Sequence, residues 1–267
     1  MSTALLGEGH PHQEREWGGV VRTVAGALGA ALSRDGARPL LTWVGADGAR
    51  TELSVRTFEN NVAKAANLLQ DDAGAHTGSR VALHLPPHWQ TAVWLGACAA
   101  TGATAWLDGD DGDPRVVLAL VAPGAVEPTA APETMAVSLH PFGLPSTVAL
   151  PPGVLDAAVE VRAHGDRFAA YDPPTGTTPW LVDGDWTWTQ AEALEAGRGL
   201  AAGFEVPDGG RVLVRSSRAA TGYRFAAAVL ALPLAIDGSV VLVTDPAADV
   251  AAVAEAERCD AALDLDD

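Results

Sequence analysis

Lysine is the scarcest charged residue in this 267-residue chain, because Lys64 is its only occurrence. All other basic residues are arginines, and 34 acidic residues against 17 basic ones give a formal net charge of −17. A protein that binds nucleic acid needs a basic stripe to displace phosphate counterions, and the sequence has none. Anionic membrane surfaces should also repel so acidic a chain. The composition therefore argues against nucleic acid and membranes as partners.

Cysteine is scarce as well, and Cys98 and Cys259 lie far apart. Two scattered thiols make neither a disulfide framework nor a metal cluster, and they fit a reducing compartment. No basic segment followed by an apolar one marks a signal peptide, so residues 1–19 are expected to be a flexible leader. The longest apolar run, 225–236, is too short to span a bilayer. We therefore expect a cytoplasmic protein.

The first half of the chain alternates strand and helix patterns. An Asp-Gly turn at 47–48 lies between the segments Leu40 to Val44 and Arg50 to Leu53, which predicts a β-hairpin. Ser54 can cap the helix that follows, because apolar residues recur behind it at helical spacing. From these patterns we expect helices at 20–32, 55–69 and 88–100, and strands at 40–44, 50–53, 80–85 and 104–107.

The second half resembles the first at an offset of 131 residues, since Gly209 to Val214 parallels Gly78 to Leu83. Thr189 and Glu192 form a capping box that opens a helix. We expect further helices at 221–232 and from Pro246, behind Asp245, and strands at 211–215, 240–243 and 261–265. The middle of the chain is rich in Asp, Pro and Gly, which predicts short strands within irregular loops.

Together these patterns predict an α/β protein with two related α/β subdomains and mostly parallel sheets. The expected division is a leader at 1–19, a first subdomain at 20–110, an irregular connecting segment with short strands at 111–179 and a second subdomain at 180–267. One sequence does not separate a true repeat from two similar units, so both interpretations stay open.

The chain resembles the N-terminal part of the AMP-forming synthetases and ligases, the adenylate-forming superfamily that includes the acyl-CoA synthetases. The residues that fit its first segment are Leu53, Ala65 or Ala66, Leu68, Gly78, Arg80, Val81 and Ala82, and the runs 212–214, 228–230 and 238–242 resemble its second subdomain. The likeness covers most of residues 20–260. The chain also looks like a group of short actinobacterial proteins that carry only this N-terminal part. The resemblance implies a truncated N-terminal domain of two related α/β subdomains.

In that family a Ser/Thr/Gly-rich loop ending in Gly-x-Pro-Lys-Gly holds the phosphates of ATP. At the corresponding place this chain has Thr175, Gly176, Thr177 and Thr178, which match the core of that loop. The lysine and the closing glycine do not follow. These residues are therefore either a degenerate phosphate loop or an ordinary linker.

Other groups that the resemblance implies are also missing. Arg218 to Thr221 stand where the family has Pro-x-x-His, and the mobile C-terminal domain with its lysine would lie beyond Asp267. Lys64 lies early in the chain and cannot replace that lysine. Because adenylyl transfer depends on positioned cations, we expect no catalytic residues, no cofactor and no adenylation.

A possible ligand site is the segment Arg215, Ser216, Ser217 and Arg218, between a predicted strand and a predicted helix. This is the ligand-binding edge of a parallel α/β sheet, where two guanidinium groups and a helix N-terminus can hold an anion. The alternative is a helix cap with exposed arginines. No metal site is expected, because the histidines at 10 and 12 lie in the leader and the acidic run 108–113 lacks EF-hand spacing.

Three functions remain open. The first is a catalytically incompetent relative of adenylate-forming enzymes that acts as a binding or interaction module. The second is part of an AMP-forming acyl ligase that an unknown partner chain completes. The third is a protein that binds a small anionic ligand at 215–218. The sequence gives neither ligand, partner nor oligomeric state.

Overall fold

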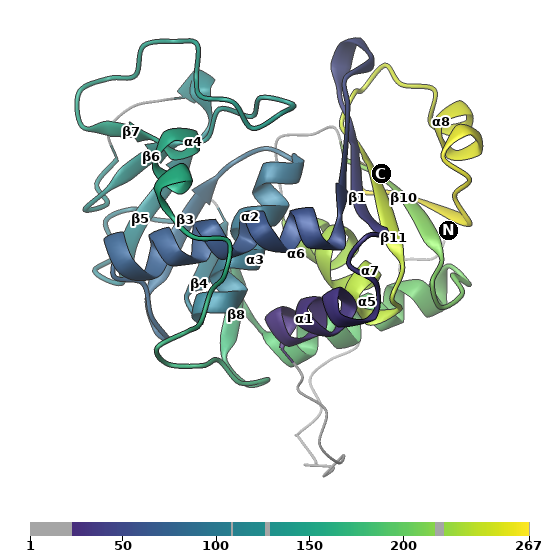
Figure 1. Cartoon of the computed structure of the whole chain (residues 1–267), viewed down its shortest axis with the longest axis horizontal. Helices are drawn as coiled ribbons and strands as arrows, with labels where there is room; N and C mark the ends of the chain where they lie inside the picture. The colour runs from purple at the N-terminus through teal and green to yellow at the C-terminus, as the bar shows by residue number, and fades with distance from the viewer. Residues whose placement is uncertain (1–22, 108, 126–128, 217–221, 267) are drawn as a thin grey trace.

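The computed structural model describes residues 23–107, 109–125, 129–216 and 222–266, and its strands form two sheets (Figure 1). The first sheet runs in the order β7 (Val154–Asp156), β6 (Thr134–Ala136), β5 (Val116–Val121), β3 (Arg80–His84), β4 (Thr104–Leu107), β8 (Pro179–Asp183) and β9 (Trp186–Thr189). The second runs in the order β12 (Ala261–Asp264), β10 (Arg211–Arg215), β11 (Ser239–Val243), β1 (Pro39–Val44) and β2 (Arg50–Ser54). All pairs are parallel except the hairpins β8–β9 and β1–β2. The predicted α/β class with mostly parallel sheets is confirmed.

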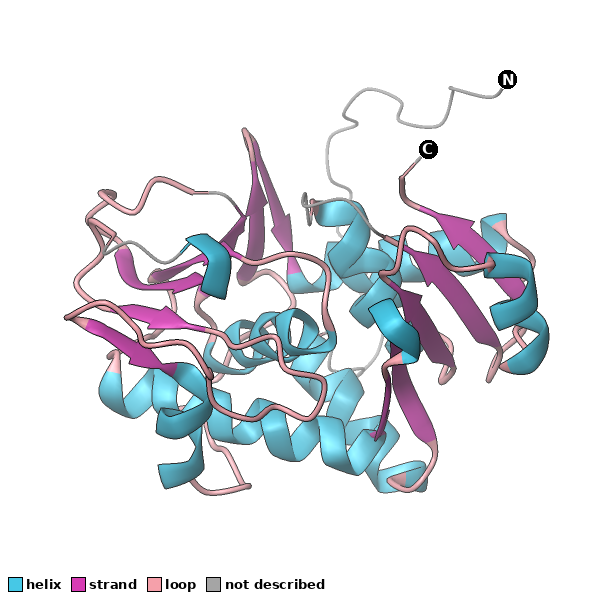
Figure 2. Cartoon of the chain, turned by 90° about the horizontal axis from the view of Figure 1, so that it is seen from above, coloured by secondary structure: helices cyan, strands magenta, loops and turns pink. Residues whose placement is uncertain are grey.

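The helices connect these strands and pack on one another. They are α1 (Val24–Asp35), α2 (Val55–Asn67), α3 (Trp89–Thr101), α4 (Ala157–Glu160), α5 (Gln190–Gly203), α6 (Tyr223–Ala226), α7 (Leu232–Ala235) and α8 (Val250–Ala256). The π-helical turns η2 (Leu68–Asp72) and η5 (Ala227–Ala231) extend α2 and join α6 to α7, and the 3-10 turns are η1 (Ala46–Gly48), η3 (Pro123–Ala125) and η4 (Val161–Ala163). Figure 2 shows the strands in two groups with helices gathered between and beneath them.

Each sheet takes its edge hairpin from the other half of the chain. The first hairpin is joined to the second sheet by the parallel pair β1–β11, and the second hairpin to the first sheet by the pair β4–β8. In Figure 1 the purple β1–β2 hairpin stands beside the strands of the C-terminal half. The exchange has a physical basis. One strand of each hairpin keeps a row of unpaired backbone groups, and these groups pair with an edge strand of the other sheet.

The predicted boundaries at 110 and 180 therefore do not coincide with the boundaries of the sheets. Residues 39–54 belong to the second sheet, and residues 179–189 belong to the first. The short strands predicted within 111–179 are β5, β6 and β7, which also extend the first sheet. Sequence patterns indicated the strands but not the strands with which they pair.

The order of strands repeats between the two sheets. The strand β3 lies between β5 and β4, and β4 is followed by β8 and β9. In the same way β10 lies between β12 and β11, and β11 is followed by β1 and β2. The two strands with similar sequences, β3 and β10, thus hold the same interior position with parallel neighbours on both sides. This agrees with the predicted relation between the two halves.

Two helix starts follow the predicted caps and one does not. The Ser54 hydroxyl accepts from the N–H of Thr57, and Thr189 opens α5 with the complete capping box. The last helix begins later than expected, because Asp249 rather than Asp245 caps it. Asp245 instead accepts from the N–H of Ala247 in a turn. Either aspartate can cap, and the prediction chose the wrong one.

The helix α1 lies at the meeting point of the two halves, where it contacts α2, α3, α5 and α7. The fully buried Gln190 accepts from the N–H of Val24 at 2.9 Å and donates to the carbonyl of Ala99 at 2.8 Å. Gly197 lets α5 approach η5 closely, since a Cβ at this position would lie 2.6 Å from the carbonyl carbon of Ala231. The buried amide of Gln190 and the contacts of α1 therefore hold the halves together, and the close approach of α5 to η5 packs the C-terminal half.

Candidate functional site

The predicted anion site begins at the carboxyl end of β10. One guanidinium nitrogen of Arg215 lies 3.2 Å from Asp264, and its Nε lies 3.7 Å from Asp266. Ser216 is buried, and its backbone N–H donates to Val243 at 3.0 Å. Ser217 and Arg218 lie outside the described residues. Two carboxylates thus neutralise Arg215, which leaves it poorly placed to bind an anion.

The predicted phosphate loop forms a closed turn before β8. The N–H of Thr178 donates to the carbonyl of Thr175 at 3.1 Å, and the N–H of Thr175 donates to the Thr178 hydroxyl at 2.9 Å. The hydroxyls of Thr175 and Thr177 lie 3.1 Å apart. The carbonyls of Gly176 and Thr178 accept from the first two residues of α5. This turn lies at the amino end of β8, whereas open parallel sheets bind ligands at the carboxyl ends.

Near the carboxyl end of β8, the β8–β9 hairpin contacts the start of α6. Asp183 accepts from the N–H of Tyr223 at 2.7 Å, and the ring of Trp188 stacks on Tyr223 with centroids 3.7 Å apart. Burial, together with the charge of Glu192, raises the pKa of Tyr223 to about 12. The buried Tyr223 hydroxyl has no hydrogen-bond partner in the described part of the protein. The Asp183 carboxylate occupies the helix N-terminus that an anionic ligand would otherwise use.

His88 lies where the carboxyl ends of the two sheets meet. Its Nδ1 accepts from the N–H of Gln90 at 3.2 Å, and its ring contacts Trp43 of β1 edge-on, with centroids 4.5 Å apart. Trp43 in turn donates to the Thr244 hydroxyl, just beyond β11, at 2.9 Å. Burial lowers the pKa of His88 to about 3. The imidazole is therefore neutral at physiological pH and only weakly basic.

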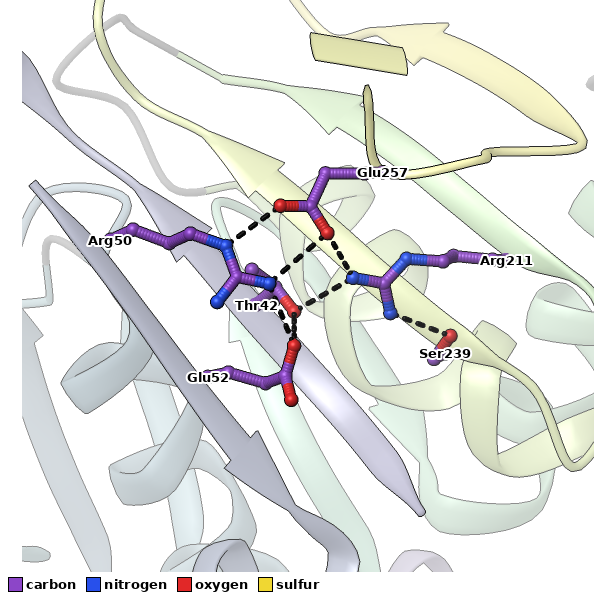
Figure 3. Close-up of polar contacts among 6 residues, drawn as sticks. All are labelled: Thr42, Arg50, Glu52, Arg211, Ser239 and Glu257. Atoms are coloured by element: carbon purple, nitrogen blue, oxygen red, sulfur yellow. Dashed lines mark hydrogen bonds and ion pairs between the residues drawn. The ribbon is translucent and has the colours of Figure 1, made fainter. Parts of the chain in front are cut away.

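A polar network that the sequence did not reveal crosses the second sheet on the face covered by α8 (Figure 3). Glu257 accepts from Arg50 at 2.7 Å and from Arg211 at 2.6 Å. Arg50 also pairs with Glu52 at 2.7 Å, and Arg211 donates to the hydroxyls of Thr42 and Ser239. The alternation of Arg50 and Glu52 places both on one face, but nothing in the pattern indicated Glu257. Because two arginines face two glutamates, this network clamps the β1–β2 hairpin to the rest of the sheet.

The described residues contain neither a cluster of metal-ligating side chains nor a membrane-spanning helix. No group of three or more His, Cys, Asp or Glu side chains there is arranged to hold a metal ion. Within the same residues, no helix combines the length and apolarity needed to cross a bilayer.

Comparisons with known proteins point to one fold. No family model matches the chain. A TIGR03089 family protein of Mycobacterium tuberculosis (strain ATCC 25618 / H37Rv) is 42% identical over 158 residues, which are 57% of this chain and 65% of that protein. The crystal structure of Brucella canis acyl-CoA synthetase matches 89% of this chain with a TM-score of 0.68 and 17% sequence identity.

The chain therefore has the α/β fold of part of an acyl-CoA synthetase. It spans 47% of that synthetase and 65% of the mycobacterial protein. The resemblance to adenylate-forming enzymes is supported at the level of the fold. At 17% identity the structural likeness carries no activity with it.

Proposed function

We propose that this protein is a relative of adenylate-forming enzymes that does not catalyse adenylation by itself and acts as a binding or interaction module. One observation carries the proposal: the described groups nearest to a phosphate-binding role are already used inside the fold. The Thr175–Thr178 turn is closed by its own hydrogen bonds, and Arg215 is paired with Asp264.

The physical reason lies in the charge that develops during adenylyl transfer. The transition state needs cations positioned in advance around the phosphates, because a mobile or neutralised cation stabilises it weakly. Asp264 and Asp266 offset the charge of Arg215, which weakens its attraction for a phosphate. Lys64, the only lysine, lies in α2 and belongs to neither candidate segment.

Pyrophosphate exchange tests this proposal directly. The purified chain is incubated with ATP, Mg²⁺, labelled pyrophosphate and a panel of carboxylic acids, beside a full-length acyl-CoA synthetase as positive control. We expect labelled ATP at the level of the protein-free blank for every acid. Exchange that depends on an acid and on this chain alone would show that the proposal is wrong.

A second candidate is an acyl ligase completed by a partner chain. It is favoured by large apolar side chains left in solvent, with Phe142 74% and Val148 65% exposed. Exchange that is absent in the isolated chain but present in a complex purified from the native host would support it. Exchange absent from both preparations would favour the binding module.

A further inference from the structure

A partly open cavity of about 60 Å³ lies between α2, α3 and the segment around α4. Most of its wall is apolar, formed by Trp89, Val93 and Trp94 of α3 and by Val161 of η4. A cavity of this size holds a few water molecules or a short alkyl chain. It shares no residue with either segment that the sequence singled out.

Gln90 supplies the first polar group of the cavity. Its side chain lines the cavity, the residue is only 8% exposed, and its Oε1 is buried without a hydrogen-bond partner. A buried amide is unfavourable unless water or a ligand completes its hydrogen bonds. The amide can also rotate to present its N–H group, so it can serve either a donor or an acceptor.

Lys64 supplies the second polar group. It lines the cavity from α2, is half-buried, and makes no ion pair with the described residues. None of the residues lining the cavity carries a carboxylate. In a chain with a net charge of −17, an ammonium group beside an apolar wall without a counter-charge is a specific feature rather than a general property of the surface.

We propose that this cavity binds a short aliphatic carboxylate of three or four carbon atoms. The alkyl chain packs against the tryptophan and valine side chains, and the carboxylate meets Lys64 and the Gln90 amide at the polar side. A charge-assisted bond to lysine and a hydrogen bond to an amide are the contacts that a carboxylate uses best. A cation would meet Lys64 with like charge, and the size of the cavity excludes a fully enclosed aromatic ring.

The site is independent of adenylation, so it stands whether or not the chain exchanges pyrophosphate. Glu160, next to Val161, is half-buried and opposes an anion at short range. With few ligand atoms and this opposing charge, we expect a Kd of about 1 mM.

The test is a titration of the whole chain with sodium propionate. Binding is measured by calorimetry and by ¹⁵N NMR of the indole groups. We expect saturable binding with shifts at Trp89 and Trp94. Propionamide, which has the same shape without the charge, should bind about tenfold more weakly. Propionate binding no tighter than propionamide binding would overturn the proposal.

Three variants locate the interaction. Lys64→Met keeps the aliphatic stem and should weaken propionate binding about tenfold while leaving propionamide unchanged. Arg198→Met removes the same charge from an exposed position on α5 and should change neither. Ala158→Leu fills the cavity and should abolish both. Lys64→Gln serves as a second variant if Lys64→Met does not fold, with the same expected loss.

Two results would contradict the site itself. Equal effects of Lys64→Met and Arg198→Met would show that only the overall charge matters. Shifts confined to indole groups other than Trp89 and Trp94 would place propionate elsewhere. Either result is distinct from the pyrophosphate assay, which concerns neither this cavity nor Lys64.

Discussion

The two exchanged hairpins occupy equivalent positions in the two sheets and both have a buried strand, but the β1–β2 hairpin adds a charged network to its attachment. The β8–β9 hairpin joins the first sheet through buried contacts. Trp180 is fully buried and donates from its indole to the carbonyl of Leu95 at 2.9 Å. Gln190, directly after the hairpin, donates to the carbonyl of Ala99 on the same helix. This hairpin is therefore fixed by burial and by hydrogen bonds that water does not reach.

The β1–β2 hairpin also has a buried strand, with Leu40, Leu41 and Trp43 of β1 in the core, but it adds a network of charged side chains. Glu257 bridges Arg50 and Arg211, and the Glu257 side chain is 15% exposed while that of Arg50 is 45% exposed. Such pairs are partly screened by solvent and salt, and they require one protonation state. This ionic part of the attachment should therefore depend on pH and salt, whereas the burial of Trp180 should not.

The largest expected effect comes from the buried hairpin. Trp180→Ala removes a fully buried indole and leaves the Leu95 carbonyl without its donor, so it should lower the free energy of unfolding by about 4 kcal/mol. Urea unfolding measures this loss. Trp186→Ala in the same hairpin is the control, because Trp186 is 73% exposed and should cost less than about 0.5 kcal/mol. Similar losses in the two variants would contradict the role of burial. Trp180→Phe, with a smaller expected loss, replaces Trp180→Ala if that variant does not fold.

The charged hairpin should show a smaller effect that depends on conditions. Glu257→Gln breaks the bridge between Arg50 and Arg211 and should cost about 2 kcal/mol at pH 7 and low salt. Added salt should reduce this cost, whereas the cost of Trp180→Ala should not change. Glu255→Gln, on the exposed side of α8, removes an equal charge and should be nearly neutral. A cost of Glu257→Gln that salt does not alter would argue against an ionic clamp.

Acid should remove the same contribution. Hydrogen bonds from Arg50 and Arg211 hold the pKa of Glu257 below its ordinary value of 4.5. A carboxyl group with a lowered pKa in the folded state stabilises the fold above its unfolded pKa, and this stabilisation is lost as the pH falls through the folded pKa. The difference between the wild type and Glu257→Gln should therefore shrink below about pH 4.5. Unfolding curves at pH 7 and pH 3.5 check this, and a constant difference would refute it.

The smallest effect concerns the helix caps behind the two hairpins. Ser54→Ala and Thr189→Ala should each cost about 1 kcal/mol, because each removes the side chain that accepts from the first turn of a helix. Thr189 should be the more costly, since Glu192 completes a capping box there and no such box stands at Ser54. Thermal unfolding of the two variants under the same conditions ranks them. A larger loss at Ser54 would show that the packing of the hairpin outweighs the cap.

Much of the local structure was predictable because it depends on neighbours in sequence. Short, mostly apolar runs marked β3, β4, β10 and β11, and caps at Ser54 and Thr189 marked α2 and α5. The start of α8 was missed because Asp245 and Asp249 are equally good caps by sequence. These signals depend on residues within a few positions of one another, so they survive without knowledge of the fold.

The candidate sites were less predictable because their partners lie far away in the chain. Asp264 neutralises Arg215 across 49 positions, and Gln190 meets Val24 across 166 positions. The cavity beside Lys64 depends on side chains of α3 and η4 that no local pattern relates to α2. A single sequence contains the groups but not their distances.

The sequence by itself determined the acidic, almost lysine-free composition, the alternation of strand and helix and the similarity of the segments around 78–83 and 209–214. These follow from residue chemistry and from the periods of 2.0 and 3.6 residues. Only the tertiary structure decided that the hairpins exchange sheets, that Arg215 is already paired, and that Lys64 and Gln90 line one cavity. The reason is that strand pairing and side-chain contacts join surfaces that are far apart in the sequence. A short segment does not determine the free energy of these contacts.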